Sequence, residues 1–155
     1  MDIYDILKEL NIDYDEIQHE AIFTVDEAKI INNRIIGIGC KNLFLTDKKG
    51  RYFLILMEEN KRANMKEIAR LLNVSHLSFA STEALKNILK LKQGSVTPLG
   101  IMNDRDNLVE LVIDSDLKDK KVLVHPNTNT RTISIDFNDL IKFIEYEKHK
   151  YVYFA

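Results

Sequence analysis

The sequence is poor in the residues that bend or cross-link a chain: its 155 residues include two prolines, five glycines, one cysteine and no tryptophan. The lone Cys40 excludes an internal disulfide. No stretch is dominated by Gly, Ser, Gln or Pro, which argues against a disordered or low-complexity linker. No apolar run approaches the roughly 20 residues that cross a bilayer. The sequence therefore predicts a soluble, cytoplasmic protein that forms a single domain over residues 1–155.

The common sequence signatures of catalysis are also missing. The chain has no Gly-rich phosphate loop, no Gly-x-Ser-x-Gly elbow, no His-Glu-x-x-His and no Cys-x-x-Cys. Its four histidines, at positions 19, 76, 125 and 149, lack the spacing of a metal site. Cys40 begins an apolar run, where a cysteine is usually a small buried hydrophobe rather than a nucleophile. We therefore expect neither a metal nor a cofactor.

Charge of neither sign dominates. The formal net charge is −2, which argues against a protein that coats nucleic acid through a general positive field. Local basic clusters are nevertheless present. Each is interpreted as a solvated turn rather than a phosphate contact, and convergence of the clusters in space would favour phosphate contacts. The clusters are Lys48, Lys49 and Arg51; Lys61 and Arg62; and Lys118, Lys120 and Lys121.

Helical spacing and capping residues predict several helices. Residues 3–11 place apolar side chains on one helical face, and this acidic start is unlike a signal peptide. Thr24 and Glu27 have the spacing of a capping box, which predicts a helix to about Ile31. Three further helices are predicted to begin after the capping residues Asn64, Ser81 and Asp136.

Runs of β-prone apolar residues predict the strands. The strongest signal is the hairpin CKNLFLTD and RYFLILME around residues 48–50. An extended piece is expected at residues 14–19, and NLVELVID, KVLVHP, RTISID and the terminal YVYF predict further strands. The runs NLVELVID, KVLVHP and RTISID follow one another too closely for helices to connect them. We therefore predict an α+β domain, with a mixed, mostly antiparallel sheet and helices packed around it.

Three stretches suggest more than scaffolding, although each has an ordinary alternative. In KNLFL, Lys41 and Asn42 open an apolar strand, and Lys41 could simply extend to solvent. In HPNTNT, a strand runs into a polar turn, and His125 could be solvated there. The loop GSVTPLGIMND begins at Gly94, which could merely end a helix. The same glycine would also let backbone groups approach a ligand closely.

These stretches, in this order, resemble the prolyl-tRNA editing family, the free-standing relatives of the editing domain inserted in bacterial prolyl-tRNA synthetase. The likeness runs from FTVDEA through KNLFLTDKKG, LSFAS, GSVTPLGI-ND and HPNTNT to the closing helix. It is greatest for the branch that removes alanine mischarged onto proline tRNA. The resemblance implies the editing-domain fold and an aminoacyl-tRNA deacylase. Its implied partners are the acceptor end of alanine-charged tRNA(Pro) and prolyl-tRNA synthetase.

The resemblance also implies the site residues. In the family a Gly-x-x-x-Pro loop carries the reaction centre, and residues 94–98 match it. The implied catalytic residues are Lys41, Gly94 and Gly100. The implied substrate-binding residues are Asn42, Ser95, Val96, Thr97, Pro98 and His125. Lys41 would face the terminal nucleotide, with Asn42 beside it.

A small apolar pocket would admit alanine and exclude proline. Val25, Ala28 and Ile38 are candidates for its lining because of their positions near Lys41, and ordinary core packing is the alternative for each. The sequence departs from the family at one point. The family often has His-Pro before the Phe-Thr-Val segment, whereas His19 is followed here by Glu20, so the shape of that pocket wall is left open.

Hydrolysis of an aminoacyl ester fits a chain without a strong nucleophile. The ester is already activated, so backbone dipoles that hold a water and stabilise the oxyanion suffice, with help from the neighbouring ribose hydroxyl. Lys41 would act as a fixed positive charge rather than as a base. Two alternatives remain at this stage: removal of another small amino acid by the same fold, and a non-catalytic sensor of charged tRNA or of a free amino acid.

Overall fold

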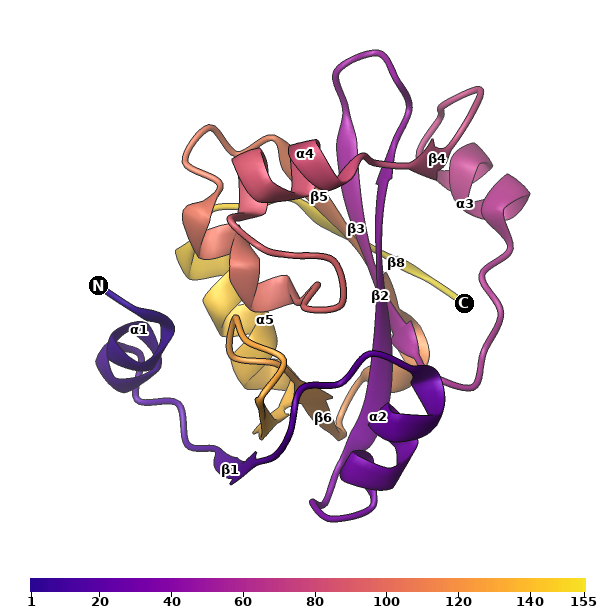
Figure 1. Ribbon diagram of the computed structural model, residues 1–155. Helices are drawn as coiled ribbons and strands as arrows, with labels where there is room; N and C mark the ends of the chain where they lie inside the picture. The colour runs from indigo at the N-terminus through magenta and orange to yellow at the C-terminus, as the bar shows by residue number, and fades with distance from the viewer.

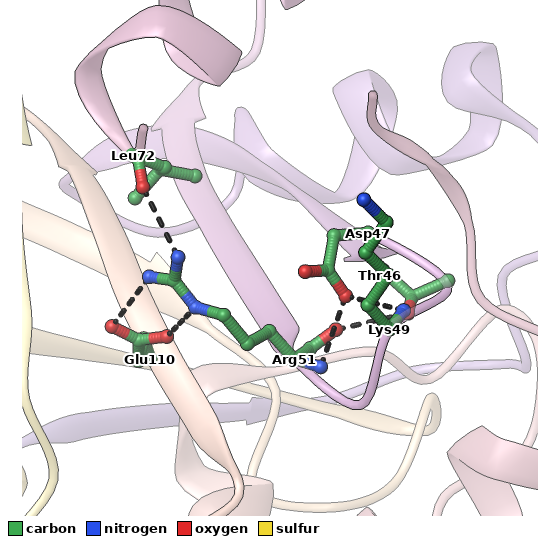
Figure 2. Close-up of polar contacts among 6 residues, drawn as sticks. All are labelled: Thr46, Asp47, Lys49, Arg51, Leu72 and Glu110. Atoms are coloured by element: carbon green, nitrogen blue, oxygen red, sulfur yellow. Dashed lines mark hydrogen bonds and ion pairs between the residues drawn. The ribbon is translucent and has the colours of Figure 1, made fainter. Parts of the chain in front are cut away.

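The computed structural model describes the backbone of residues 1–155 and every side chain except that of Val25. At its centre is the predicted hairpin, formed by β2 (Ile38–Thr46) and β3 (Tyr52–Glu58) in antiparallel register. The Asp47 carboxylate closes the turn by accepting from the Lys49 and Arg51 N–H groups, at 2.8 and 3.0 Å. Figure 2 shows these contacts, together with the Arg51 guanidinium that reaches Glu110 on a neighbouring strand.

The sheet confirms the predicted mixed α+β class. Its strand order is β1-β7-β6-β2-β3-β5-β8, with β4 also paired to β2. The pairs β1–β7, β6–β7, β2–β3 and β2–β4 are antiparallel, whereas β2–β6, β3–β5 and β5–β8 are parallel. The remaining strands are β1 (Asp15–Gln18), β4 (Ser78–Phe79), β5 (Val109–Asp114), β6 (Lys121–Val124), β7 (Arg131–Asp136) and β8 (Tyr151–Phe154).

Helices cover both faces of this sheet (Figure 1). Helix α3 (Met65–Leu71) packs a small core of Ile68 and Leu72 onto one face of β2 and β3. The larger core lies on the other face, under α1 (Ile3–Glu9) and α5 (Phe137–Tyr146). The other helical segments are α2 (Val25–Asn32), α4 (Thr82–Ala84), the π-helix η1 (Leu85–Leu89), and the 3₁₀ helices η2 (Pro98–Asn103) and η3 (Ser115–Leu117).

Two of the predicted helix starts differ in detail from the expectation. The Thr24 hydroxyl accepts from the Glu27 N–H as predicted, but it then donates to the Glu27 carboxylate, so the capping box is only half made. Asp136 precedes α5, yet its side chain makes no capping hydrogen bond within the described chain. The Phe137 N–H instead donates to the Lys120 carbonyl at 2.9 Å.

The helix expected after Ser81 forms, but it changes type. Ser81 caps α4 through the Ala84 N–H, at 3.0 Å, and the chain then widens into η1. Leu85 and Leu89 are both buried at the two ends of that widened turn, which places their side chains in the larger core. The packing of these leucines therefore outweighs the preference for a regular α-helix. In the described residues, no helix has the length and hydropathy needed to span a bilayer.

Candidate functional site

A cavity of about 450 Å³ lies between α2, β2 and the loop that precedes η2. Its wall takes residues from several elements that are distant in sequence. Among the predicted site residues it brings together Ala28, Asn42, Gly94, Val96 and His125. The predictions that drew on three separate stretches of sequence therefore converge at one place.

One edge of β2 is without a strand partner at this cavity. On the side away from β3, β2 pairs with β6 at Ile38 and Gly39 and with β4 at Leu45 and Thr46. Between these two contacts, no strand of the described chain pairs with that edge. The gap exposes main-chain groups to the cavity because an unpaired strand edge presents its N–H and C=O groups outward.

The hydrogen-bond alternation identifies which main-chain groups face the gap. The Glu59 N–H donates to the Gly39 carbonyl at 2.9 Å, which marks the odd-numbered residues of β2 as those bonded to β3. The Ala80 N–H donates to the Phe44 carbonyl at 2.9 Å, so even-numbered residues point toward the opposite edge. The main-chain N–H and C=O of Asn42 therefore face the cavity.

The Asn42 side chain adds a second group to the same wall. It lines the cavity, and its Oδ1 is buried without a hydrogen-bond partner in the described chain. A buried amide oxygen left unpaired costs about 1–3 kcal/mol, and such groups usually find a partner. This oxygen is an unsatisfied acceptor within the wall of the cavity.

The loop opposite Asn42 has the backbone geometry that only glycine accepts easily. Gly94 has φ +90°, a conformation that side chains with a Cβ rarely adopt. Gln93, Gly94 and Val96 line the cavity. The sequence offered no signal for Gln93 beyond its place before the glycine. The loop is held at its start by the Ser95 N–H, which donates to the Lys92 carbonyl at 3.0 Å.

The later part of the loop supports the site rather than lining it. Thr97 is fully buried, and its hydroxyl donates to the His125 carbonyl at 2.7 Å while accepting from the Leu99 N–H at 3.3 Å. Pro98 begins η2, where its fixed φ and missing N–H suit the first helical position. A Cβ on the buried Gly100 would lie 2.6 Å from a Leu91 methyl.

The positions of Ser95, Thr97, Pro98 and Gly100 therefore differ from the expectation that these residues contact the substrate. All four are buried, and none is among the described residues that line the cavity. Their physical role is to fix the Gly94 turn and to tie it to the strand that carries His125. Gly100 is required here for close packing rather than for a special backbone angle.

His125 is the titratable group best placed for chemistry. Its Nδ1 donates to the Arg131 carbonyl at 3.0 Å. Burial lowers the pKa of this imidazole below its ordinary 6.5, and the nearby His19 lowers it further. The ring is therefore neutral at pH 7, with Nε2 as its acceptor. His19 stands edge-on to it, with ring centroids 6.3 Å apart, and Thr132, which also lines the cavity, contacts His19 Nε2 at 2.8 Å.

Cys40 also lines the cavity, yet its environment makes it unreactive. Burial raises the pKa of the Cys40 thiol to about 12, so the sulfur is protonated at pH 7. The thiol donates to the Ile38 carbonyl at 3.4 Å. Cys40 is therefore part of the cavity wall rather than a nucleophile. In the described residues, no cluster of His, Cys, Asp or Glu is arranged to hold a metal ion.

Lys41 lies differently from the position that the resemblance implied. Successive strand side chains point to opposite faces, and Cys40, Asn42 and Phe44 are the β2 residues that line the cavity. The Lys41 side chain thus leaves β2 on the face where Leu43 packs near α3. Lys41 is not among the described residues that line the cavity. Ile38 packs against the larger core instead of the cavity. Ala28 does line it. The Val25 side chain lies outside the described residues.

The sheet order, the helices on both faces and the cavity at the β2 edge define the aminoacyl-tRNA editing class of domain. A solved structure named as a candidate trans-editing enzyme for prolyl-tRNA synthetase has the same fold. It matches with a TM-score of 0.73 and 18% identity, over 97% of this chain and 92% of that chain. The family model for the aminoacyl-tRNA editing domain matches residues 19–143. The chain belongs to this family.

Relatives with higher identity agree with this assignment. The prolyl-tRNA editing protein ProX of Acetoanaerobium sticklandii is 36% identical over 141 residues, which cover 90% of this chain and 86% of that protein. The prolyl-tRNA synthetase associated domain-containing protein 1 of Danio rerio is 34% identical over 151 residues, covering 96% of this chain and 82% of that protein. The resemblance inferred from the sequence motifs is therefore confirmed.

Proposed function

We propose that this editing domain hydrolyses the ester that joins alanine to proline tRNA, and that it acts in trans to prolyl-tRNA synthetase in the cytoplasm. The observation that carries the proposal is the cavity wall itself, where the Gly94 loop faces the unpaired edge of β2 at Asn42. Such a wall offers main-chain hydrogen bonds to an aminoacyl group. It provides no strong nucleophile, and an activated ester needs none.

The chemistry runs through a single water molecule. The neutral His125 accepts a hydrogen bond from this water at Nε2 and removes its proton as the oxygen attacks the ester carbonyl carbon. Main-chain N–H groups of the Gly94 loop stabilise the oxyanion that forms. The bond from the carbonyl carbon to the ribose oxygen then breaks, and that oxygen takes the proton back. The products are free alanine and a tRNA with an intact terminal hydroxyl.

The remaining groups of the cavity suit the rest of this substrate. Asn42 Oδ1 lacks a donor, and rotation of its amide toward the cavity would let it accept from the protonated amino group of alanine. The apolar side of the cavity, including Ala28 and Val96, suits a methyl side chain. Phe23 and Phe79 line the cavity and remain largely exposed, as expected of side chains on which the terminal adenine would stack.

The need for such a second site follows from the sizes of the amino acids. A pocket built for proline cannot strongly reject alanine, because each missing methylene lowers the binding free energy by only about 1–3 kcal/mol. A second site that excludes proline by size can remove the error. The test is to follow hydrolysis of alanyl-tRNA(Pro), prolyl-tRNA(Pro) and alanyl-tRNA(Ala) side by side. We expect loss of the first ester alone.

Two other results would lead to the alternatives. Faster loss of a seryl or cysteinyl ester than of the alanyl ester would mean that the same fold removes a different amino acid. Tight binding of alanyl-tRNA(Pro) with no loss of its ester would identify a sensor. The neutral His125 beside the Gly94 loop favours the enzyme, because a sensor has no use for a base.

The role of His125 gives the reaction a defined pH dependence. Because the pKa of His125 is lowered below 6.5 by burial, the neutral form that accepts the water's proton persists at pH 7. Enzymatic hydrolysis should fall as the pH drops through this lowered pKa and should be level just above it. We expect His125→Gln to reduce kcat by about 100-fold or more and to remove this acid limb. An unchanged pH profile in His125→Gln would exclude His125 as the base.

Lys41 is proposed to act from the far face of β2. Because no strand covers the β2 edge beside it, its four-carbon stem can pass that edge and bring a fixed positive charge toward the terminal nucleotide. We expect Lys41→Ala to lower kcat/KM for alanyl-tRNA(Pro) by roughly 30-fold or more, about 2 kcal/mol, and Lys41→Arg to restore much of it. Full activity in Lys41→Ala would show that strand alternation keeps this lysine out of the site.

A further inference from the structure

A second groove, of about 750 Å³, adjoins the cavity along η1 and the start of the Gly94 loop. Thr82 and Gln93 line both hollows, so the groove and the cavity adjoin at these two residues. Three lysines line the groove, Lys86, Lys90 and Lys92, against one acidic residue, Glu83. The sequence alone did not single out these lysines, since they are spread over a predicted helix and its end.

The fold explains why these three lysines come together. Leu85, Leu89 and Leu91 are buried in the larger core, whereas Lys86, Lys90 and Lys92 are exposed. Lys90 ends η1 with φ +57°, a left-handed conformation that is uncommon for a residue other than glycine. The helical segment ends at this residue, and Lys92 beyond it lines the same groove as Lys86.

In each of the basic clusters noted in the sequence, one member is already engaged by another side chain. The Arg51 guanidinium pairs with Glu110 at 3.0 Å, Lys61 pairs with Asp114 at 2.8 Å, and the Lys118 ammonium lies 3.9 Å from the centre of the Tyr153 ring. Neither Lys86 nor Lys92 has an acidic partner within the part of the chain that the structure describes. Lys90 Nζ donates to the Asn87 carbonyl at 3.0 Å, which leaves its charge unneutralised.

We propose that this groove binds the phosphodiester backbone of the single-stranded 3′ end of tRNA. The inference rests on the proposed function, which puts the terminal ester beside Gly94. The nucleotides before the terminal adenosine must then leave the cavity, and the shared rim at Thr82 and Gln93 leads directly to the lysines. Successive phosphates present negative charge at a regular interval, which matches a row of unneutralised lysines.

The experiment compares two double charge reversals that change the net charge equally. One variant carries Lys86→Glu and Lys92→Glu in the groove. The other carries Lys66→Glu and Arg70→Glu on α3, which packs on the other face of the sheet. Binding of a short fluorescent single-stranded RNA ending in CCA is measured by anisotropy over a range of salt concentrations. Turnover is measured with alanyl-tRNA(Pro) and with alanyl-adenosine, which contains the ester but no phosphodiester.

We expect the groove variant to bind the RNA at least roughly tenfold more weakly, with the salt slope reduced by about 1.4, or about 0.7 for each phosphate that a lysine no longer neutralises. Its KM for alanyl-tRNA(Pro) should rise, while turnover of alanyl-adenosine stays near that of the α3 variant. Equal RNA binding by the two variants would overturn the proposal. So would a parallel loss of alanyl-adenosine turnover, because the lysines would then serve the chemistry or the fold rather than the phosphates.

The same measurements separate this proposal from the proposed function. If the unaltered protein hydrolyses none of the esters but its RNA binding still depends on Lys86 and Lys92, the groove assignment stands and the hydrolase assignment fails. If alanyl-tRNA(Pro) is hydrolysed and RNA binding is insensitive to both lysines, the hydrolase stands and the groove assignment fails.

Discussion

Replacing Gly94 by valine should abolish turnover while leaving the protein folded. Gly94 has φ +90°, and a β-branched residue is strained in this region by about 1–3 kcal/mol. Valine would relieve the strain by moving the backbone of the loop. A displacement of about 1 Å at a reacting group can cost about 100-fold in rate. Because the loop carries the oxyanion donors in the proposed mechanism, we expect kcat/KM to fall by at least that factor.

The loss should be local because there is room for the added atoms. The nearest atom to a Cβ placed on Gly94 is the Ile22 carbonyl oxygen, at 3.8 Å, an ordinary contact distance. Folding should therefore suffer only from the backbone strain. The measurement is the initial rate with alanyl-tRNA(Pro), recorded together with the thermal unfolding midpoint of the same preparation.

Gly50 offers a matched control for this substitution. It has φ +97° in the β2–β3 turn, and a Cβ there would meet nothing within 4 Å. Gly50→Val therefore carries similar backbone strain at a position away from the cavity lining. We expect the two variants to lose similar stability and only Gly94→Val to lose turnover. If Gly94→Val kept its activity, the backbone mechanism would be wrong.

Local signals in the sequence account for the parts of the fold that were predicted. The apolar runs on either side of residues 48–50 form the central hairpin, and the side chains of Thr24, Asn64 and Ser81 each accept the expected capping hydrogen bond. Each of these features depends on residues that are close in sequence. The parallel pairing of β3 with β5 joins strands about fifty residues apart, and no local pattern specifies it.

Motifs identify residues but not the direction of their side chains, so only some of the expected site residues line the cavity. Strand alternation alone implies that Lys41 and Asn42, as neighbours in β2, point to opposite faces, so only one of them can line the cavity directly. That conclusion was within reach of the sequence. The roles of Thr97 and Gly100 were not, since they depend on a hydrogen bond to the His125 carbonyl and on contact with Leu91.

The lysine groove and the exposed rings of Phe23 and Phe79 at the cavity were also not predicted, for a related reason. Phe79 looks like an ordinary core residue in the segment LSFAS, yet β4 is so short that the ring stays exposed at the cavity. Lys86 and Lys92 line one groove across the π-helical turn of η1 and the left-handed Lys90, neither of which the sequence pattern predicted. Both features arise from irregular backbone that packing imposes.

The largest loss of stability is expected from Asp104→Ala. The Asp104 carboxylate is 4% exposed, and it accepts from the Leu108 and Val109 N–H groups at 3.1 and 2.8 Å and from His149 Nε2 at 2.9 Å. His149 is 6% exposed, and its Nδ1 faces the Glu147 carbonyl at 2.9 Å. Both ring nitrogens of His149 thus lie within hydrogen-bond distance of an oxygen atom.

Removing Asp104 would leave the buried His149 ring and two buried main-chain donors without their shared partner. Each buried polar group left unsatisfied costs about 1–3 kcal/mol, so the three together cost at least about 3 kcal/mol, out of the roughly 5–15 kcal/mol that stabilise a typical domain. Urea unfolding should register this loss as a lower midpoint. Asp116→Ala is the control, because Asp116 also pairs with a basic residue, Lys61, but its side chain is 63% exposed. We expect that change to cost at most about 1 kcal/mol.

The acid side of the stability curve gives a second readout of the same contact. Burial alone would raise the pKa of Asp104, but the hydrogen bonds from His149, Val109 and Leu108 hold it below its ordinary 3.8. A carboxyl whose folded-state pKa is depressed contributes stability above its unfolded pKa of about 3.9 and loses that contribution as the pH falls through the folded value. The unaltered protein should therefore lose this part of its stability below about pH 4. In Asp104→Ala that part should already be missing at pH 7, so the difference between the two proteins should shrink on acidification. A difference that stayed constant from neutral to acid pH would mean that the hydrogen bonds accepted by the ionised carboxylate are not what Asp104 contributes.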